Sequence, residues 1–277
     1  MNFKIVSDSS ADISTLRALP YETVPLKIIT SEKEYTDDSS LNVDLMLDEL
    51  KKYKGKSRSS CPNPDDYLRA FGDAENVFCV TITSGLSGSC NSALAAAKSY
   101  TESYPERRVH VIDTLSTGPE CALITEKLEE LILSGGDFDS VKAEISKYCE
   151  KTKLCFALES LHNLARNGRV SPIVAKLSGL LGIRVIGRAS DAGTLEVSGK
   201  ARGMQNAITA LVNNIITEGY SGGRVRIHHA RGEQAANILK AKLLDKFPSA
   251  NIEIAHTRGL CSFYAELGGL LVGFETA

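Results

Sequence analysis

The stretch VTITSGLSGSCNSALAAAKSY, from Val80 to Tyr100, decides the fold of this 277-residue chain. Apolar residues from Val77 to Ile82 predict a buried strand, and the Ala-rich sequence after residue 89 predicts a helix. A loop of hydroxyl residues and glycines, residues 83–89, joins the two. Because the first turn of a helix has unpartnered N–H groups and partial positive charge, this loop is a candidate site for a carboxylate or a phosphate.

The same loop has a simpler interpretation. In this interpretation Ser87 does no more than cap the following helix, and Gly85 and Gly88 do no more than turn the chain. Six of the seven residues from 83 to 89 are Thr, Ser or Gly, which is more than a cap needs. Capping and anion binding therefore both stay open.

Composition favours a globular protein of two domains. The length exceeds that of one typical domain, and 43% hydrophobic and 24% charged residues are ordinary values. A net charge of −2 with 6% aromatic residues argues against a nucleic-acid partner. No apolar run is long enough for a membrane span, and the N-terminus carries acids where a signal peptide would be apolar.

The seven cysteines are scattered and form no CxxC pair. This argues against a disulfide framework or a zinc site and favours a reducing cytoplasm. The five histidines show no metal-binding spacing such as HExxH. We therefore expect neither a metal ion nor a cofactor.

Strands and helices alternate in the first half, which predicts a parallel sheet with flanking helices. The strands are expected at 3–6, 24–30, 77–82, 109–112 and 154–158, and the helices at 13–19, 43–53, 64–71, 90–100, 117–133, 141–149 and 160–165. The second half instead contains a hairpin signal, strands at 183–186 and 194–197 around Asp191-Ala192-Gly193. We expect an α/β fold with an N-terminal domain, 1–157, and a mixed α/β C-terminal domain, 158–277.

Two further loops carry polar side chains next to predicted strands. Asp8-Ser9-Ser10-Ala11-Asp12 follows the first strand, and in a parallel sheet such loops meet at the edge where ligands bind. Capping by Ser10 or Asp12 is the alternative. Ser59 and Ser60 precede a proline-bounded segment that starts a helix at 64, so their hydroxyls lie in a rigid loop.

Residues 85–89, Gly-Leu-Ser-Gly-Ser, nearly match the nucleophile elbow G-x-S-x-G, although the final glycine is missing. A triad would also need an acid and a histidine, such as Asp113 or Asp191 with His256, and nothing local supports these. An acyl or ester hydrolase with Ser87 as nucleophile is therefore an alternative function. The glycine patterns of P-loops and of dinucleotide-binding folds are absent.

Three charged features have two interpretations each. Arg169, in Asn-Gly-Arg, could bind an anion or a partner, or be a surface arginine on a turn. Glu266, before the last strand, is either a solvated acid at a helix end or a buried group near the site. The run from Lys51 to Arg58 is basic, and such runs are usually solvated faces.

Several stretches, taken in order over nearly the whole chain, resemble the DegV family of bacterial fatty-acid-binding proteins. The loop at 83–89 followed by Asn-Ser-Ala is the most specific of them. The stretches are Asp8-Ser9-Ser10-Ala11-Asp12, Val24-Pro25-Leu26 with Asp37 or Asp38 after it, Ser59-Ser60-Cys61-Pro62, Thr83 to Ser89 with Asn91-Ser92-Ala93, Ser160-Leu161 through Gly168-Arg169-Val170, and Lys200-Ala201-Arg202-Gly203.

The resemblance implies a long-chain fatty acid bound in a cleft between the two domains, and a protein that is not itself an enzyme. It implies that hydroxyls and backbone of the two loops hold the carboxylate: Ser59, Ser60, Ser84, Ser87 and Gly88. Some members are the lipid-binding subunit of a fatty-acid kinase and present the carboxylate to a separate ATP-binding subunit. Arg169 and Arg202 are then candidate contacts for a partner or an anion.

One departure concerns the head group. Many relatives carry a His-x-Gly-Pro-Gly pattern whose histidine touches the ligand carboxylate, and aligning the final strand puts Glu266 at that position. A glutamate beside a fatty carboxylate would be repelled unless one of the two holds a proton. Glu266 is therefore a candidate head-group residue. Its charge also leaves two alternative ligands, another amphiphile or a phosphorylated metabolite.

Overall fold

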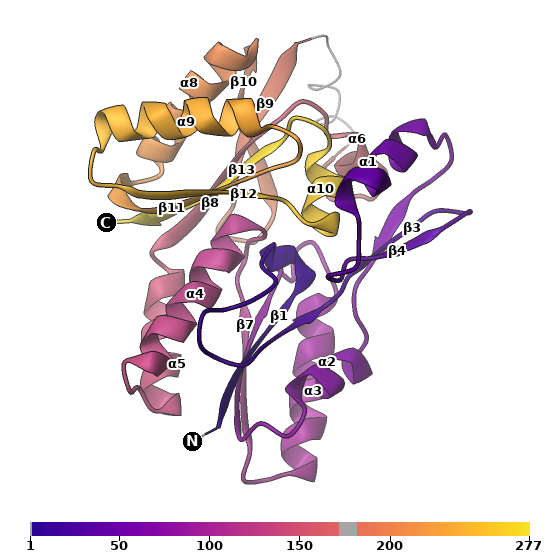
Figure 1. The fold of residues 1–277 in the computed structure, drawn as a ribbon, viewed down its shortest axis with the longest axis vertical. Helices are drawn as coiled ribbons and strands as arrows, with labels where there is room; N and C mark the ends of the chain where they lie inside the picture. Colours follow the sequence, from indigo (N-terminus) through magenta and orange to yellow (C-terminus); the bar gives the residue numbers. More distant parts are fainter. Residues whose placement is uncertain (1, 172–181) are drawn as a thin grey trace.

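The computed structural model describes residues 2–171 and 182–277 (Figure 1). Its strands are β1 (Phe3–Asp8), β2 (Tyr21–Val24), β3 (Lys27–Ile29), β4 (Glu34–Thr36), β5 (Arg58–Ser60), β6 (Asn76–Thr81), β7 (Arg108–Asp113), β8 (Thr152–Leu158), β9 (Ile183–Ala189), β10 (Leu195–Arg202), β11 (Tyr220–His229), β12 (Asn251–His256) and β13 (Leu270–Thr276). Its helices are the short 3-10 helix η1 (Ser9–Ala11) and α1 (Val43–Lys52), α2 (Pro64–Phe71), α3 (Ser89–Ser103), α4 (Pro119–Leu133), α5 (Phe138–Cys149), α6 (His162–Arg166), α8 (Met204–Thr217), α9 (Glu233–Lys246) and α10 (Gly259–Ala265).

The first half is built around a four-stranded sheet in the order β2-β1-β6-β7, in which all neighbours pair in parallel. Alternate residues of β6 point to opposite faces of the sheet. Phe78 and Val80 pack with residues of α4 and α5, whereas Val77 and Cys79 pack with residues of α2 and α3. The predicted N-terminal parallel sheet with flanking helices is confirmed.

Two expectations for this half are wrong. No helix forms over 13–19, because Asp12 takes the left-handed conformation, with φ 59°, and ends η1. The N–H groups of Ala18 and Leu19 instead donate to Glu129 Oε1, at 2.8 and 3.1 Å. The strand expected over 24–30 is divided at Pro25, which has no N–H to give to a sheet, into β2 and β3 of different sheets.

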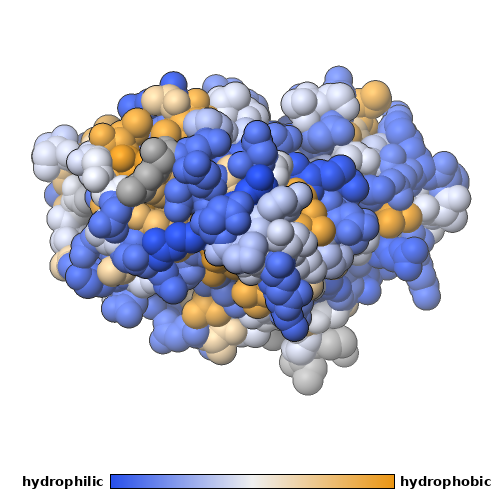
Figure 2. Space-filling model, turned by 90° about the horizontal axis from the view of Figure 1, so that it is seen from below, coloured by the Kyte–Doolittle hydropathy of each residue, from blue (hydrophilic) through white to orange (hydrophobic). Residues whose placement is uncertain are grey.

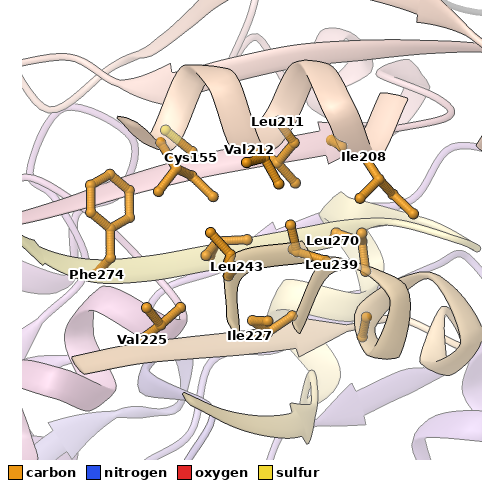
Figure 3. Packing of buried hydrophobic residues seen from close by; sticks show 14 of the residues in the cluster. Cys155, Ile208, Leu211, Val212, Val225, Ile227, Leu239, Leu243, Leu270 and Phe274 are labelled. Atoms are coloured by element: carbon orange, nitrogen blue, oxygen red, sulfur yellow. The ribbon is translucent and has the colours of Figure 1, made fainter. Parts of the chain in front are cut away.

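The second half is built around a six-stranded sheet in the order β10-β9-β8-β13-β11-β12, in which only the β11–β12 pair is parallel. Helices α8 and α9 cover one face with a buried apolar cluster (Figure 3). Along β8, Cys155 and Ala157 belong to this cluster, while Leu154, Phe156 and Leu158 point to the opposite face. A mixed α/β second half is confirmed.

The place of β8 differs from the expected domain limits. It pairs with β13 on one side and β9 on the other, so it belongs to the six-stranded sheet, whereas a boundary at 157/158 would leave it with the first half. A short buried strand has the same apolar pattern whichever sheet it joins, so periodicity could not assign it. The chain passes from one sheet to the other between α5 and β8.

Helix α4 packs against both sheets and joins the two halves. Arg226 on β11 forms a two-pronged ion pair with Glu126 on α4, with Nε–Oε1 at 3.0 Å and Nη2–Oε2 at 2.7 Å. At Gly273 on β13 an added Cβ would lie 2.5 Å from the backbone nitrogen of Glu120. Glycine at this point therefore lets the start of α4 approach the sheet.

A small third sheet, β4-β3-β5, lies beside α1 and α10 and was not predicted. The face seen in Figure 2 is mainly hydrophilic, with hydrophobic residues in separate small groups, as is usual for exposed protein surface. Among the described residues, no helix has the length and apolar character needed to cross a bilayer.

Candidate functional site

A cavity of about 300 Å³ lies between the two halves, with walls that are mostly apolar. This volume is at the lower end of the range for small-molecule sites, roughly 300–1,000 Å³. The residues of β8 that point away from α8 and α9 form much of one wall. The apolar lining comprises Leu26, Ile82, Leu86, Leu154, Phe156, Leu158, Leu164, Leu195, Leu260, Ala265 and Leu271.

Polar groups from separate parts of the chain also line this cavity. Four of the expected head-group residues are among them, Ser59, Ser60, Ser87 and Gly88, together with Arg169. The loop after β6 and the end of β5 are therefore brought together, and Ser59 and Ser60 lie in this strand and not in the loop that was expected. Arg169 Nε donates to the carbonyl of Leu86 at 3.1 Å, which fixes the guanidinium beside the Ser87 loop.

The start of α3 opens into the cavity. Gly88 is its N-cap and supplies no side-chain cap, and Ser87 Oγ accepts from the N–H of Ser89 at 3.2 Å. An added Cβ on Gly88 would lie 3.1 Å from Cys61 Sγ, so the backbone approaches closely here. Ser87 thus accepts a hydrogen bond from the start of the helix and also lines the cavity, and the positive end of the helix dipole faces this cavity.

Tyr264 on α10 is a lining residue that the sequence interpretation missed. Its hydroxyl lies 2.6 Å from Ser59 Oγ. Burial raises the pKa of Tyr264, an effect that the Ser59 hydrogen bond and the charge of Arg169 oppose. The phenol therefore stays protonated and can donate a hydrogen bond to an anion.

A signal for Tyr264 was present in the sequence. Aligning Tyr264, instead of Glu266, with the histidine of His-x-Gly-Pro-Gly puts Gly268 at the last glycine of that pattern. The segment before it reads as a loop because α10 has only seven residues and begins with a glycine.

Three candidate residues lie away from this cavity. Glu266 has φ 54°, which turns the chain after α10, and its Oε1 accepts from Ser160 Oγ at 2.9 Å and from the N–H of Asn163 at 3.0 Å. It lines a different cavity. Ser84 is exposed at the tip of its loop, and Arg202 is exposed at the end of β10, so neither lines the cavity between the halves.

Two buried carboxylates hold the start of α10 in place. Asp12 Oδ1 accepts from the N–H of Arg258 at 2.7 Å, and Asp37 accepts from Gly259 and Leu260 at 2.7 and 2.9 Å. Burial raises the pKa of Asp37 to about 6, against the effect of these backbone hydrogen bonds. The first half thereby positions the helix that carries Tyr264.

The loop at 8–12 also has a structural role. Asp8 accepts from the N–H of Ser10 at 3.1 Å and from that of Ile82 at 2.9 Å, and so ties η1 to the end of β6. Asp12 Oδ2 lies 3.1 Å from His228 Nδ1 on β11, a buried contact between the halves. Asp8 therefore caps η1, and the capping expected of Ser10 or Asp12 does not occur, because the helix expected over 13–19 does not form.

The residues imagined for a hydrolase triad are dispersed. In the described parts of the chain no histidine hydrogen-bonds to Ser87. Asp113 accepts from the backbone of Ser84, Asp191 pairs with Lys153 at 2.7 Å, and His256 packs edge-on against His229. Nor do the described residues contain a group of three His, Cys, Asp or Glu side chains that could hold a metal ion.

A family model for DegV proteins matches residues 2–276. The chain belongs to the DegV family. A DegV domain-containing protein of Streptococcus gordonii is 44% identical over 99% of each chain.

Two solved DegV structures are very similar to this one. A DegV family protein from Eubacterium eligens loaded with heptadecanoic acid is 43% identical, with a TM-score of 0.97 over 99% of this chain and 100% of that one. The Fatty Acid Kinase (Fak) B3 protein of Streptococcus pneumoniae, loaded with linoleic acid, is 44% identical, with a TM-score of 0.98 over the whole of both chains. The family and the two-part α/β fold that the sequence predicted are confirmed.

Proposed function

We propose that this DegV protein binds one long-chain fatty acid in the cavity between its halves. The observation that carries the proposal is the pairing of apolar walls with one set of anion-binding groups. The carboxylate lies against the start of α3, with Ser59, Ser87, Tyr264 and Arg169 around it. The fatty acids in the two similar structures support this choice of ligand.

The energetics favour tight binding without catalysis. Each buried methylene contributes about 0.8 kcal/mol, so a dozen of them contribute roughly 10 kcal/mol before the cost of association. Hydrogen bonds to a charged group add about 1.5–3 kcal/mol each. Arg169 and the helix dipole favour the ionised form of the carboxylic acid, so the head group needs no proton to enter.

We further propose that the protein presents this carboxylate to an ATP-binding kinase subunit and does no chemistry on it. Cys61 and Gly88 at the head-group end are exposed, so this end reaches the surface where a partner can approach. Similarity to the pneumococcal Fak B3 protein supports a kinase partner. All seven cysteines are free, which supports a reducing, cytoplasmic location.

Native mass spectrometry of the protein purified from bacteria, followed by lipid extraction, tests the proposal. We expect a mass increment of one fatty acid per chain. Ser87→Phe should abolish the increment, because the ring fills the head-group site, whereas Ser84→Phe, on the exposed tip of the same loop, should keep it. Lipid retained by the Ser87 variant, or no uptake of added fatty acid by the wild type, would overturn the proposal.

A further inference from the structure

A second, larger cavity of about 660 Å³ lies beside the first and shares two helices with it. Asn163 and Phe263 line the second cavity, whereas their neighbours Leu164 and Tyr264 line the first. The far side of the second cavity is the end of α1 and the segment that follows it. The two cavities are therefore separated by α6 and α10.

The acids of the second cavity already have partners. Glu159 accepts from Arg184 Nε at 3.1 Å, which neutralises both groups. The carboxylate of Glu266 accepts two hydrogen bonds, from a serine hydroxyl and a backbone N–H of the same cavity wall. The charge of Glu159 is thus cancelled, whereas the donors to Glu266 are neutral and do not cancel its charge, so the three cations Lys51, Lys54 and Arg166 exceed it by two.

Lys51, near the end of α1, and Lys54, two residues after this helix, have no such partners among the described residues. Lys51 and Lys54 line the cavity and form no ion pair within the described residues, although lysines of the neighbouring sheet do, as in Lys33–Glu49 at 2.8 Å. They belong to a run with five basic residues in eight, from 51 to 58, without an acid. Positive charge is thus concentrated at one wall in a chain whose net charge is −2.

Arg166 completes the positive wall from the other side. Its Nη1 donates to the carbonyl of Gly55 at 3.2 Å and lies 3.3 Å from His162 Nε2. These contacts fix the guanidinium across the cavity from α1 and leave its other N–H groups without a described partner. A fixed guanidinium with free donors matches the oxygens of a phosphate.

We propose that this second cavity binds a phosphorylated small molecule, with its phosphates on Lys51, Lys54 and Arg166. The rest of the lining mixes polar side chains such as Ser160 and Asn163 with apolar ones such as Leu50 and Leu267, so the ligand has an uncharged part with both kinds of surface, as a nucleoside diphosphate has. The volume lies within the range for such ligands. The site is distinct from the fatty-acid cavity and does not depend on it.

Calorimetric titration with pyrophosphate and with adenosine diphosphate tests this site, with adenosine as the probe that lacks phosphate. We expect both phosphates to bind with Kd below about 1 mM and adenosine to bind at least roughly tenfold more weakly. The double variant Lys51→Ser/Lys54→Ser should weaken both phosphates by roughly tenfold or more. Lys52→Ser/Lys56→Ser removes two charges from the same run outside this cavity and should change affinity less than about twofold.

Each other outcome rejects the site. Failure of both phosphates to bind, or equal binding of adenosine, shows that the cations hold no phosphate. Equal losses in the two double variants show diffuse attraction to the basic run and no defined site. Fatty-acid content, measured on the same samples by native mass spectrometry, should be unchanged in both variants, so failure here is distinguishable from failure of the proposed function.

Discussion

Replacing Leu158 by Phe should shorten the fatty acid that the protein can hold. Leu158 is 2% exposed, lies on β8 and points into the cavity of about 300 Å³. Phenylalanine has three more side-chain carbons than leucine but two fewer hydrogens, so its extra volume is about that of one methylene and it displaces about one methylene of the ligand. At about 0.8 kcal/mol, this gives a roughly fourfold higher Kd for the longest chain.

The assay is competitive binding of myristic, palmitic and stearic acids to the delipidated protein. We expect the loss to be greatest for stearic acid and smallest for myristic acid, because only the longer tail needs the filled volume. Leu133→Phe makes the same change at a position that is 57% exposed and serves as the control. Unchanged affinity for stearic acid in a folded Leu158→Phe protein would refute the assignment of this cavity to the tail.

Three further predictions concern single side chains. Tyr264→Phe removes one donor to the carboxylate and should weaken fatty-acid binding roughly tenfold without moving the midpoint of thermal unfolding; equal affinity in the same titration would exclude Tyr264 from the head-group site. Arg226→Ala leaves Glu126 without its partner and should lower the free energy of unfolding by about 3 kcal/mol in urea titrations, and a loss below about 1 kcal/mol would contradict this role. Burial raises the pKa of Glu120 from its ordinary 4.5 to about 7. Between these values the folded state binds more protons than the unfolded state, so stability should fall by about 3 kcal/mol as the pH rises. Glu120→Gln should remove that fall between about pH 5 and pH 8, and equal falls in the two proteins would disprove it.

Local signals predicted those elements whose ends are set by their own residues. Asn63 and Asp66 form the capping box of α2, so the expected bounds of 64–71 are those observed. The helix expected over 13–19 failed because distant groups decide that segment: Glu129 supplies the acceptors for its N–H groups. The residues around 13–19 in the sequence give no indication of this contact with Glu129.

The residues of the candidate site also divide into those that local sequence predicts and those whose place depends on distant contacts. Ser87 and Gly88 belong to a loop whose composition marks it, Ser59 and Ser60 end strand β5 before a proline-bounded segment, and the structure brings the loop and the strand end to one cavity. Tyr264 lies on a helix too short to have a clear periodicity, and its place follows from carboxylates of the first half that hold that helix. Glu266 is a candidate in the sequence through its place before the last strand and through the alignment, but a turn at positive φ directs it to the second cavity.

The two faces of β8 have different roles: one face contributes to the stability of the fold and the other to the choice of ligand. Cys155 and Ala157 belong to the core under α8 and α9. The alternate residues Leu154, Phe156 and Leu158 line the fatty-acid cavity. Substitutions at Leu154, Phe156 and Leu158 can therefore change the length or shape of the bound chain while the core on the other face stays intact. Relatives that hold different fatty acids can differ at alternate positions of one strand and still share the same fold.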